Sequence, residues 1–509
     1  MNLSFCSKCG KKVEVKHVQR DGREYLEKLC PDCGSTYVLV SSDNAMYARK
    51  RNMMRDQVPT GCDLNCLNCH SHRQPNVVFV ETTNRCNMNC PICITNVPSM
   101  GFEFEPDMEY FDRIFKFCAS FEDPPSIQLF GGEPTVREDL FEIISLARSY
   151  GLTVRLVTNG LKLADKDYCD KIMKSGASVL ISFDGLKREL YEKLRGSAAS
   201  MDLKLKALEN ISGHKKGKVI LMTVIDKELN GDDMERFLEY CFENSRIVRG
   251  IFPMPLTQVW SESKLDYRPE RTTPEDVEKI VDKAVEGKVE FVPLGSLEFK
   301  HLAKLFRVNH MPFLGVHPNC ESFTLLVNNG KKFVSVNNFL KKGAFSFVED
   351  LRALDKRAEK AVKKGGSMFF PRAAIALSLG ALVIRNADSR GLVGASGFKA
   401  FGRWMKMAFE ILCGKKPKKV FKDHTGLRGI LQVLILPFEH DDTLESERLQ
   451  ICSSGYAYID EKTDSIKLIP TCIWDRFKDE CLRSNAVRFN KPGYGKGLAQ
   501  GAAPTTDRG

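Results

Sequence analysis

Short apolar runs and longer amphipathic segments alternate through the middle of the chain. The apolar runs have the length of strands, about four to eight residues. We predict strands at residues 77–80, 126–130, 153–157, 178–181, 218–225 and 249–254. Apolar residues at three- and four-residue steps predict helices at 139–150, 165–175 and 234–244. This alternation predicts an α/β fold, a partial (β/α)6 barrel of parallel strands.

The segment 365–419 has a different pattern. Its longest uncharged apolar run, Ala373 to Ile384, has 12 residues, short of the roughly 18 to 20 that cross a bilayer. From Phe398 to Cys413, large apolar residues recur at helical steps, with lysines and arginines off that stripe and more lysines after it. This pattern predicts a basic amphipathic helix, which either packs on the protein's own core or lies in an anionic membrane surface.

Length and composition are those of a folded protein with several domains. The chain has 509 residues, of which 43% are hydrophobic and 28% charged, as in ordinary globular proteins. The N-terminus shows no export signal, so we expect a cytoplasmic protein that associates peripherally with the membrane. The net charge of +11 agrees with an anionic partner without identifying it. The C-terminal residues 491–509 are predicted to be a disordered tail.

Eighteen cysteines in a chain without an export signal indicate metal thiolates rather than disulfides. Two pairs with a two-residue spacing begin the chain, Cys6 with Cys9 and Cys30 with Cys33. Two such pairs can supply four thiolates in a tetrahedron. Zinc and a single rubredoxin-like iron fit this site equally well.

Two further cysteine groups share a three-then-two spacing. They are Cys62, Cys66 and Cys69, and then Cys86, Cys90 and Cys93. Three thiolates on a short loop can hold three irons of a 4Fe-4S cube. The second of these loops follows the predicted strand 77–80, and ligand sites of barrels lie at that end of the strands.

The cysteine triplet at Cys86, Cys90 and Cys93 resembles the signature of the radical SAM superfamily. Further motifs at the ends of the next three predicted strands agree with it: Gly131-Gly132-Glu133-Pro134, Thr158-Asn159-Gly160 and Ser182-Phe183-Asp184-Gly185. The resemblance implies that the triplet holds a 4Fe-4S cluster that cleaves S-adenosylmethionine (SAM). It also implies that SAM is bound by Gly131, Gly132, Glu133, Thr158, Asn159, Ser182 and Asp184.

In that superfamily the cleaved cofactor yields a radical that abstracts hydrogen from an unactivated carbon, and the protein orients the reactants. An electron donor such as ferredoxin or flavodoxin is then an expected partner. The sequence singles out no catalytic residue beyond the cluster ligands.

The remaining cysteines suggest auxiliary clusters. Cys62, Cys66 and Cys69 form the first, for which His70, His72, a distant cysteine or an open iron are the candidates at the fourth position. Dispersed cysteines in the C-terminal half suggest a second, with Cys320, Cys452, Cys472 and Cys481 as candidate ligands. The cofactors expected are thus three 4Fe-4S clusters, SAM and one mononuclear iron or zinc. Cys118, Cys169, Cys241 and Cys413 lie in helical patterns and are predicted core residues.

The whole layout resembles the tetraether and membrane-spanning lipid synthases. The resemblance implies a metal domain at 1–60, an auxiliary-cluster segment at 61–75, a barrel at 76–310, and an α+β iron–sulfur domain at 311–490 with lipid-facing helices at 365–419. It implies carbon–carbon coupling of lipid alkyl chains.

Two alternatives to this function remain. The first is methylation or another radical modification of a pterin-like small molecule. The second, an electron-transfer or nucleic-acid-binding protein, is disfavoured, because the basic residues are dispersed and the Gly-Gly-Glu-Pro motif would be unexplained.

Overall fold

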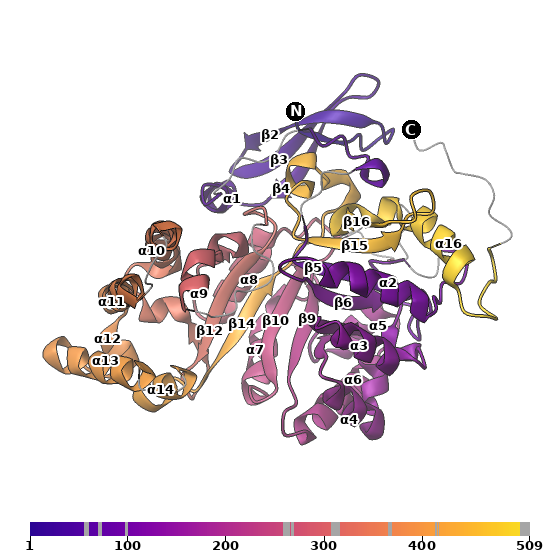
Figure 1. The fold of residues 1–509 in the computed structure, drawn as a ribbon. Helices are drawn as coiled ribbons and strands as arrows, with labels where there is room; N and C mark the ends of the chain where they lie inside the picture. The colour runs from indigo at the N-terminus through magenta and orange to yellow at the C-terminus, as the bar shows by residue number, and fades with distance from the viewer. Residues whose placement is uncertain are drawn as a thin grey trace.

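The computed structural model describes all residues except 55–60, 70–73, 97–99, 258–264, 266–268, 307–315, 365–368, 413–414, 416 and 499–509. Its first unit is an antiparallel sheet of four strands in the order β1 (Leu3–Phe5), β2 (Lys12–Arg20), β3 (Arg23–Cys30) and β4 (Gly34–Ser41). Alternate side chains of β2 and β3 are buried, as expected when one face of a sheet is packed and the other faces water. Helix α1 (Asn44–Arg51) leads away from this sheet toward the barrel (Figure 1).

The predicted barrel is present, and its six strands are parallel and consecutive: β5 (Val77–Thr83), β6 (Ser126–Gly131), β7 (Val154–Thr158), β8 (Ser178–Ser182), β9 (Val219–Ile225) and β10 (Val248–Pro255). Every residue of β5 and β7 is buried, because helices cover one face and the barrel interior the other. The connecting helices are α2 (Met108–Ala119), α3 (Leu140–Ser149), α4 (Lys166–Ser175), α5 (Arg188–Arg195), α6 (Ser200–Gly213), α7 (Met234–Glu243) and α8 (Pro274–Ala284). Predicted strand and helix positions agree with these elements to within a few residues.

The C-terminal part extends the barrel sheet at both edges. At one edge β14 (Gly429–Ile435) pairs in parallel with β10, and β12 (Ser322–Asn328) pairs antiparallel with β14. The small strands β11 (Val292–Pro293) and β13 (Phe333–Ser335) both pair with β12. At the other edge β15 (Ser454–Ile459) pairs in parallel with β5, and β16 (Ile466–Pro470) follows antiparallel. The predicted separate domain at 311–490 therefore shares its sheet with the barrel, because an open barrel has two unpaired edges that strands can satisfy.

A helical extension stands at one side of the barrel. We call residues 343–424 the arm: α10 (Gly343–Lys364), α11 (Phe369–Asn386), α12 (Ser389–Val393), α13 (Gly397–Leu412) and α14 (Pro417–His424). It lies at the end of the molecule farthest from α16 (Lys478–Phe489), beyond β12 and α9 (Lys300–Phe306) (Figure 1). Among the described residues, no helix is long and apolar enough to cross a membrane.

The start of the predicted disordered tail is folded. Residues 491–498 are described, and the Lys496 carbonyl accepts a hydrogen bond of 3.0 Å from the Glu103 amide. A Cβ atom at Gly497 would lie 2.0 Å from the Gly101 carbonyl oxygen. This stretch therefore packs beside the segment that follows the Cys86–Cys93 loop, and Gly497 permits the close approach because it has no side chain. Residues 499–509 lie outside the described part.

Three of the four predicted core cysteines, Cys118, Cys169 and Cys241, are fully buried in the main hydrophobic core. The fourth, Cys413, lies outside the described residues.

Candidate functional site

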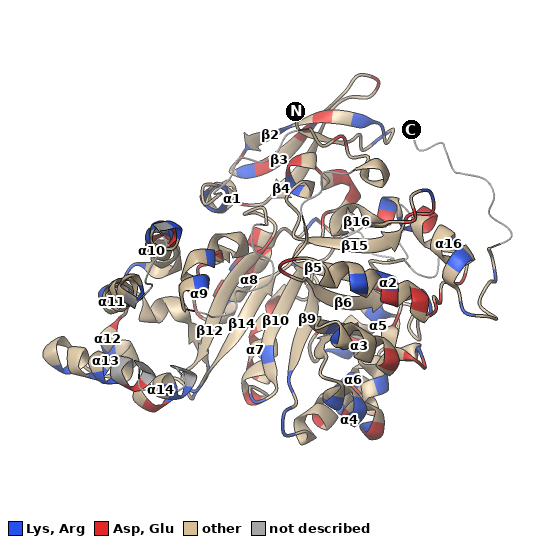
Figure 2. Ribbon diagram, viewed as in Figure 1, with Lys and Arg blue, Asp and Glu red and all other residues tan. Residues whose placement is uncertain are grey.

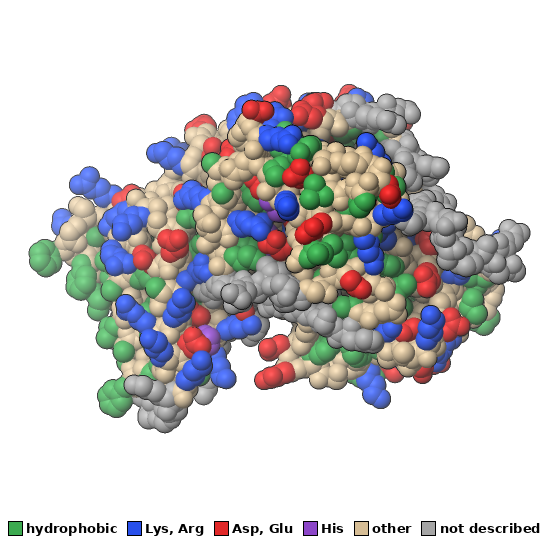
Figure 3. All heavy atoms as spheres, turned by 90° about the horizontal axis from the view of Figure 1, so that it is seen from above, with side chains coloured by type: hydrophobic (Ala, Val, Ile, Leu, Met, Phe, Trp, Pro, Cys, Tyr) green, Lys and Arg blue, Asp and Glu red, His purple; other side chains and the backbone are tan. Residues whose placement is uncertain are grey.

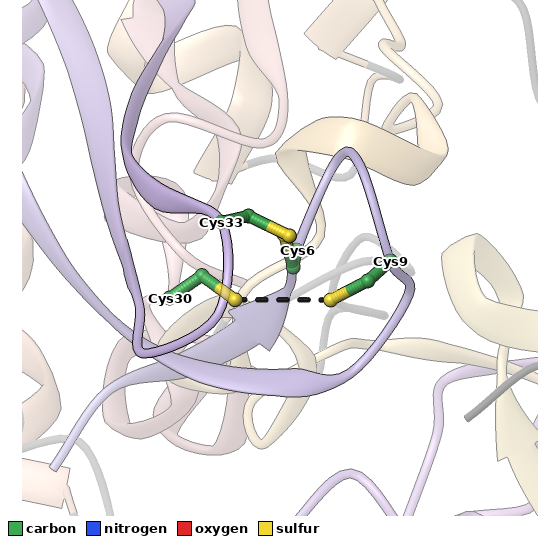
Figure 4. Close-up of side chains that lie close together, drawn as sticks. All are labelled: Cys6, Cys9, Cys30 and Cys33. Carbon is green, nitrogen blue, oxygen red and sulfur yellow. Dashed lines mark hydrogen bonds between the residues drawn. The ribbon is translucent and has the colours of Figure 1, made fainter.

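The N-terminal cysteines form a compact four-sulfur site. Cys6, Cys9, Cys30 and Cys33 come from the two hairpin ends of the first sheet and point toward one another (Figure 4), with their sulfur atoms within 4.8 Å. The sulfurs of Cys9 and Cys30 are 3.7 Å apart. Four thiolates at about 2.3 Å from one ion in a tetrahedron would stand about 3.8 Å apart, so the arrangement fits a single metal ion.

A cavity of about 250 Å³ occupies the barrel interior at the carboxyl ends of the strands. The predicted cluster ligands Cys86, Cys90 and Cys93 line it, on the loop that follows β5. Gly131, Gly132, Glu133, Thr158, Asn159 and Ser182 line the same cavity. The tertiary structure thus brings together all but one of the residues predicted to hold the cluster and SAM.

The two glycines of the Gly-Gly-Glu-Pro motif let strand β6 approach the cysteine loop. A Cβ atom at Gly132 would lie 2.2 Å from the carbonyl oxygen of Arg85, the residue before Cys86. At Gly131, φ is +125°, and a Cβ atom would lie 2.5 Å from the Thr83 carbonyl oxygen. The Gly132 amide donates to that same oxygen at 2.7 Å. No larger residue fits either position without moving the loop.

Glu133 joins two strand ends. One carboxylate oxygen accepts hydrogen bonds of 2.6 Å from the hydroxyls of Thr135 and Thr158. The other accepts a hydrogen bond of 2.6 Å from the Asn159 amide. The resemblance implies that Glu133 binds SAM, and the structure gives it a further role, because these hydrogen bonds fix β7 against β6 at the cavity rim.

Asp184, which was predicted to bind SAM, pairs with a cation instead and does not line the cavity. It accepts hydrogen bonds of 2.6 and 2.9 Å from Nε and Nη2 of Arg195. Arg195 ends helix α5 and itself lines the cavity. Burial opposes the charge of Arg195, but Asp184 outweighs it and raises the pKa of the guanidinium. A fixed, buried cation at this position suits the carboxylate of SAM. The sequence reasoning missed Arg195, because nothing in the pattern of α5 distinguishes it from the other basic residues of that helix.

Lys204 is a second buried cation that the sequence reasoning missed. Its Nζ donates to the Ser182 carbonyl at 2.6 Å and to the Ser182 hydroxyl at 2.7 Å. Burial, together with the nearby charge of Arg195, lowers the pKa of Lys204 to about 7. Lys204 therefore holds the end of β8 in place.

The C-terminal cysteines divide into three and one. Cys320, Cys452 and Cys472 line the cavity on the side formed by β12 and β15. Arg448 Nε donates to the Cys320 sulfur at 3.3 Å. Cys481 does not join them: it is buried in α16, which packs on β15 within the main core. Three of the four predicted cluster ligands therefore line the cavity. Cys481 does not, because α16 places its side chain in the core.

Cys62, Cys66 and Cys69 lie on a separate loop against β16, where Lys467 Nζ donates to the Leu67 carbonyl at 2.9 Å. Burial, with Cys62 and Cys69 nearby, raises the pKa of Cys66 to about 12. Asn76 stands between this loop and β5, and its amide donates to the Ser453 carbonyl at 2.7 Å. The candidate ligands His70 and His72 lie outside the described residues.

The donor sets fit the implied cofactors. Cys86, Cys90 and Cys93 would hold a 4Fe-4S cluster, and the buried guanidinium of Arg195 would be available to the carboxylate of SAM. With SAM, such a cluster would supply a carbon-centred radical, and the residues that line the cavity would position the reactants.

Comparisons with known proteins identify two family models and several relatives that this chain resembles. Residues 80–241 match the model of the radical SAM superfamily, and residues 2–42 match that of the HMPTM N-terminal zinc ribbon domain. The chain is 30% identical over 355 residues to the 7,8-dihydro-6-hydroxymethylpterin dimethyltransferase of Methanocaldococcus jannaschii, covering 66% of this chain and 70% of that protein. It is 31% identical over 188 residues to the GTP 3',8-cyclase of Nautilia profundicola, covering 35% of this chain and 56% of that protein. The SAM-bound crystal structure of Streptococcus suis SuiB is 16% identical, covers 39% of this chain and 44% of that one, and gives a TM-score of 0.32.

The more specific resemblance to tetraether lipid synthases remains a hypothesis. The family is established by the match of residues 80–241 to the superfamily model and by the 30% identical relative, 70% of which this chain covers. The cavity with its cysteine loop agrees with both. This protein therefore belongs to the radical SAM superfamily, as a radical SAM enzyme with an N-terminal zinc ribbon domain.

Proposed function

We propose that this enzyme uses a SAM-derived radical to abstract hydrogen from a carbon of a pterin-like heterocycle bound in the barrel cavity, so that this carbon is methylated by a separate methyl donor, such as a second SAM molecule, or is otherwise modified. The observation that carries the proposal is a set of three buried polar side chains, Gln128, Arg155 and Glu321, in a cavity that also holds the Cys86, Cys90 and Cys93 loop. The relative that is 30% identical and named as a pterin dimethyltransferase supports the same substrate class.

Glu321 suits the polar edge of a pterin ring. Its side chain is buried, and its Oε2 atom has no hydrogen-bond partner within the described protein. Burying an unsatisfied carboxylate costs free energy, about 1 to 3 kcal/mol or more, which a bound donor offsets. The ring amino group and a ring N–H of a pterin are donors of that kind, and the guanidinium of Arg155 can donate to the ring carbonyl.

The walls around this polar set are apolar. Phe79, Phe130 and Phe252 of the barrel strands and Leu436 and Phe438 of the segment after β14 line the cavity. A flat heterocycle can pack between aromatic faces while its edge is hydrogen-bonded. Cys320, Cys452 and Cys472 line the same cavity, so a cluster held there would share this space with the substrate.

A second candidate is carbon–carbon coupling of lipid alkyl chains. The same apolar walls favour it, because a hydrocarbon chain needs burial and no hydrogen bonds. In this case the buried Oε2 atom of Glu321 would be left without a hydrogen-bond donor, which is why we place it second.

One experiment separates the two substrates. The cluster-reconstituted protein is incubated anaerobically with SAM and dithionite, and with either 6-hydroxymethyl-7,8-dihydropterin or a lipid extract, and products are analysed by mass spectrometry. The proposal predicts a pterin product that carries added carbon, and substrate-dependent formation of 5'-deoxyadenosine. Coupled lipids that lack two hydrogens, with the pterin unchanged, would overturn it in favour of lipid coupling.

Two variants serve as controls. Cys86→Ala is expected to abolish 5'-deoxyadenosine formation with either substrate. Glu321→Gln is expected to weaken pterin binding at least tenfold while its SAM binding stays equal to that of the wild type. If Glu321→Gln leaves pterin binding unchanged, Glu321 does not bind the polar edge of the pterin ring.

A further inference from the structure

The described apolar side chains of helix α13 lie on two faces, and one of these faces is buried by the fold. Ala400, Trp404 and Met407 are buried in a small core that the arm makes for itself. Phe398 and Phe401 lie on the other side of the helix and are 96% and 53% exposed. Met405, one turn further along that side, is exposed as well. The single stripe predicted from the sequence is thus split, because a helix turn of 3.6 residues places these two sets on different faces.

Helix α11 repeats this arrangement. Ile375 and Leu382 are buried against α9 and α10. Phe370 and Leu377, also seven residues apart, are 77% and 76% exposed. Packing between described residues of the arm therefore buries one face of each helix, while Leu377 of α11 and Phe398 and Phe401 of α13 are exposed on the other. Figure 3 shows hydrophobic side chains along the outer edge of the molecule on the side of the arm, with lysines and arginines beside them.

The arm also carries almost all of the net charge. Residues 343–424 contain 17 lysines and arginines and 7 aspartates and glutamates. Their net charge of +10 compares with +11 for the whole chain. Lys399 and Lys406 of α13 are exposed on the helix that presents Phe398 and Phe401. Figure 2 shows basic residues distributed over α10, α11 and α13.

We propose that the arm docks the enzyme on an anionic lipid bilayer surface, with the outer apolar side chains of α11 and α13 inserted shallowly and the lysines against the headgroups. Large apolar side chains next to lysines are the composition of helices that lie in a membrane interface. The core of a protein–protein interface is instead depleted of lysine. Nucleic acid would use the positive charge but would leave Leu377 and Met405 exposed to water. The proposal does not depend on the substrate, because vesicle binding requires neither SAM nor turnover.

Vesicle sedimentation of the full-length protein tests this proposal. The probes are vesicles of phosphatidylcholine alone and of phosphatidylcholine with about one third phosphatidylglycerol, at low and high salt. We expect binding to the anionic vesicles, weakened by salt because the attraction between exposed charges is screened. The double variant Phe398→Ser/Phe401→Ser is expected to lose about tenfold or more in affinity. Lys399→Glu/Lys406→Glu is expected to lose binding to anionic vesicles by at least about fivefold.

Matched variants outside the arm separate a local effect from a general one. Leu203→Ser/Val487→Ser removes two exposed apolar side chains from α6 and α16. Lys171→Glu/Lys174→Glu reverses two exposed lysines of α4. Both are expected to bind vesicles like the wild type. Equal losses in these controls would overturn the proposal.

Two other partners could bind the outer faces of α11 and α13: a second copy of this chain, or a nucleic acid. Parallel experiments distinguish both from a membrane. Light scattering without lipid shows whether the wild type is a dimer that Phe398→Ser/Phe401→Ser dissociates, in which case the outer faces bind a second copy and the proposal is wrong. Binding of a single-stranded oligonucleotide that the arm variants abolish, with no vesicle binding, would contradict it equally.

Discussion

The Nε2 atom of His17 lies 2.9 Å from Oε2 of Glu445, so an ion pair joins the zinc ribbon domain to the segment that leads to Cys452. His17 Nδ1 also lies 3.2 Å from Glu24 Oε1 of its own sheet. Burial opposes protonation of His17, but the charge of Glu445 and hydrogen bonding to both carboxylates outweigh it and raise its pKa to about 9. Burial likewise disfavours the charge of Glu445, but His17 prevails and lowers the pKa of that carboxyl to about 2.

This pair predicts a pH-dependent stability of the domain contact. The folded pKa of His17, about 9, lies above its usual value of 6.5, so its stabilisation is fully present below about pH 6.5 and is lost as the pH rises through 9. We expect His17→Gln to lower the free energy of unfolding by up to about 3 kcal/mol near pH 6, and by much less at pH 10. Thermal unfolding at both pH values measures this.

A suitable control is Arg23→Gln in the zinc ribbon domain. It removes an exposed ion pair in which Arg23 Nη1 lies 4.0 Å from Glu270 Oε1. It should change stability little at either pH, because exposed pairs contribute little. A destabilisation of His17→Gln that is equal at pH 6 and pH 10 would refute the prediction.

Gly132→Ala is expected to displace the cluster loop. The added Cβ atom would meet the Arg85 carbonyl oxygen at 2.2 Å, and backbone atoms cannot move aside as a flexible side chain can. We expect lower iron content after reconstitution and at least tenfold weaker SAM binding, with the fold retained by circular dichroism. Gly213→Ala is the control, because a Cβ atom there meets nothing within 4 Å. Full iron content in Gly132→Ala would contradict the proposed packing.

Arg195→Gln is expected to weaken SAM binding by about tenfold or more, because a charge-assisted hydrogen bond to the SAM carboxylate is lost. Arg195→Lys should recover part of the affinity, since it keeps the charge but not the paired geometry with Asp184. Calorimetric titration of the reconstituted protein with SAM measures both. Arg188→Gln, on the same helix but in an exposed pair with Asp202, should bind SAM normally. If the Arg195 and Arg188 variants behave alike, Arg195 has no specific role.

Iron content tests whether the C-terminal cluster is held by Cys320, Cys452 and Cys472 without Cys481. Cys472→Ala is expected to lose the iron of one cluster, because Cys472 lines the cavity with Cys320 and Cys452. Cys481→Ala should keep its iron and lose only packing in the core, by about 1 kcal/mol. Iron and sulfide analysis with Mössbauer spectroscopy distinguishes the two. The reverse result would restore Cys481 as a ligand and exclude Cys472.

Much of the fold follows from local pattern. The six barrel strands, the two N-terminal cysteine pairs and the two cysteine triplets are predicted because each depends on neighbours a few residues apart, where covalent geometry limits the distance between side chains. The motif at Gly131, Gly132 and Glu133 is predicted from the resemblance to the radical SAM superfamily. The packing reason for Gly132, its close approach to Arg85, comes only from the structure.

Only the tertiary structure decided how distant segments meet. Three features depend on such contacts: the Asp184–Arg195 pair, the burial of Cys481, and the pairing of β14 and β15 with opposite edges of the barrel. In each case the separation of the segments along the chain does not set their distance in space. The split of α13 into an inner and an outer apolar face has the same origin: hydrophobicity marks both sets of residues alike, and only the packing of α11, α12 and α14 decides which set is covered.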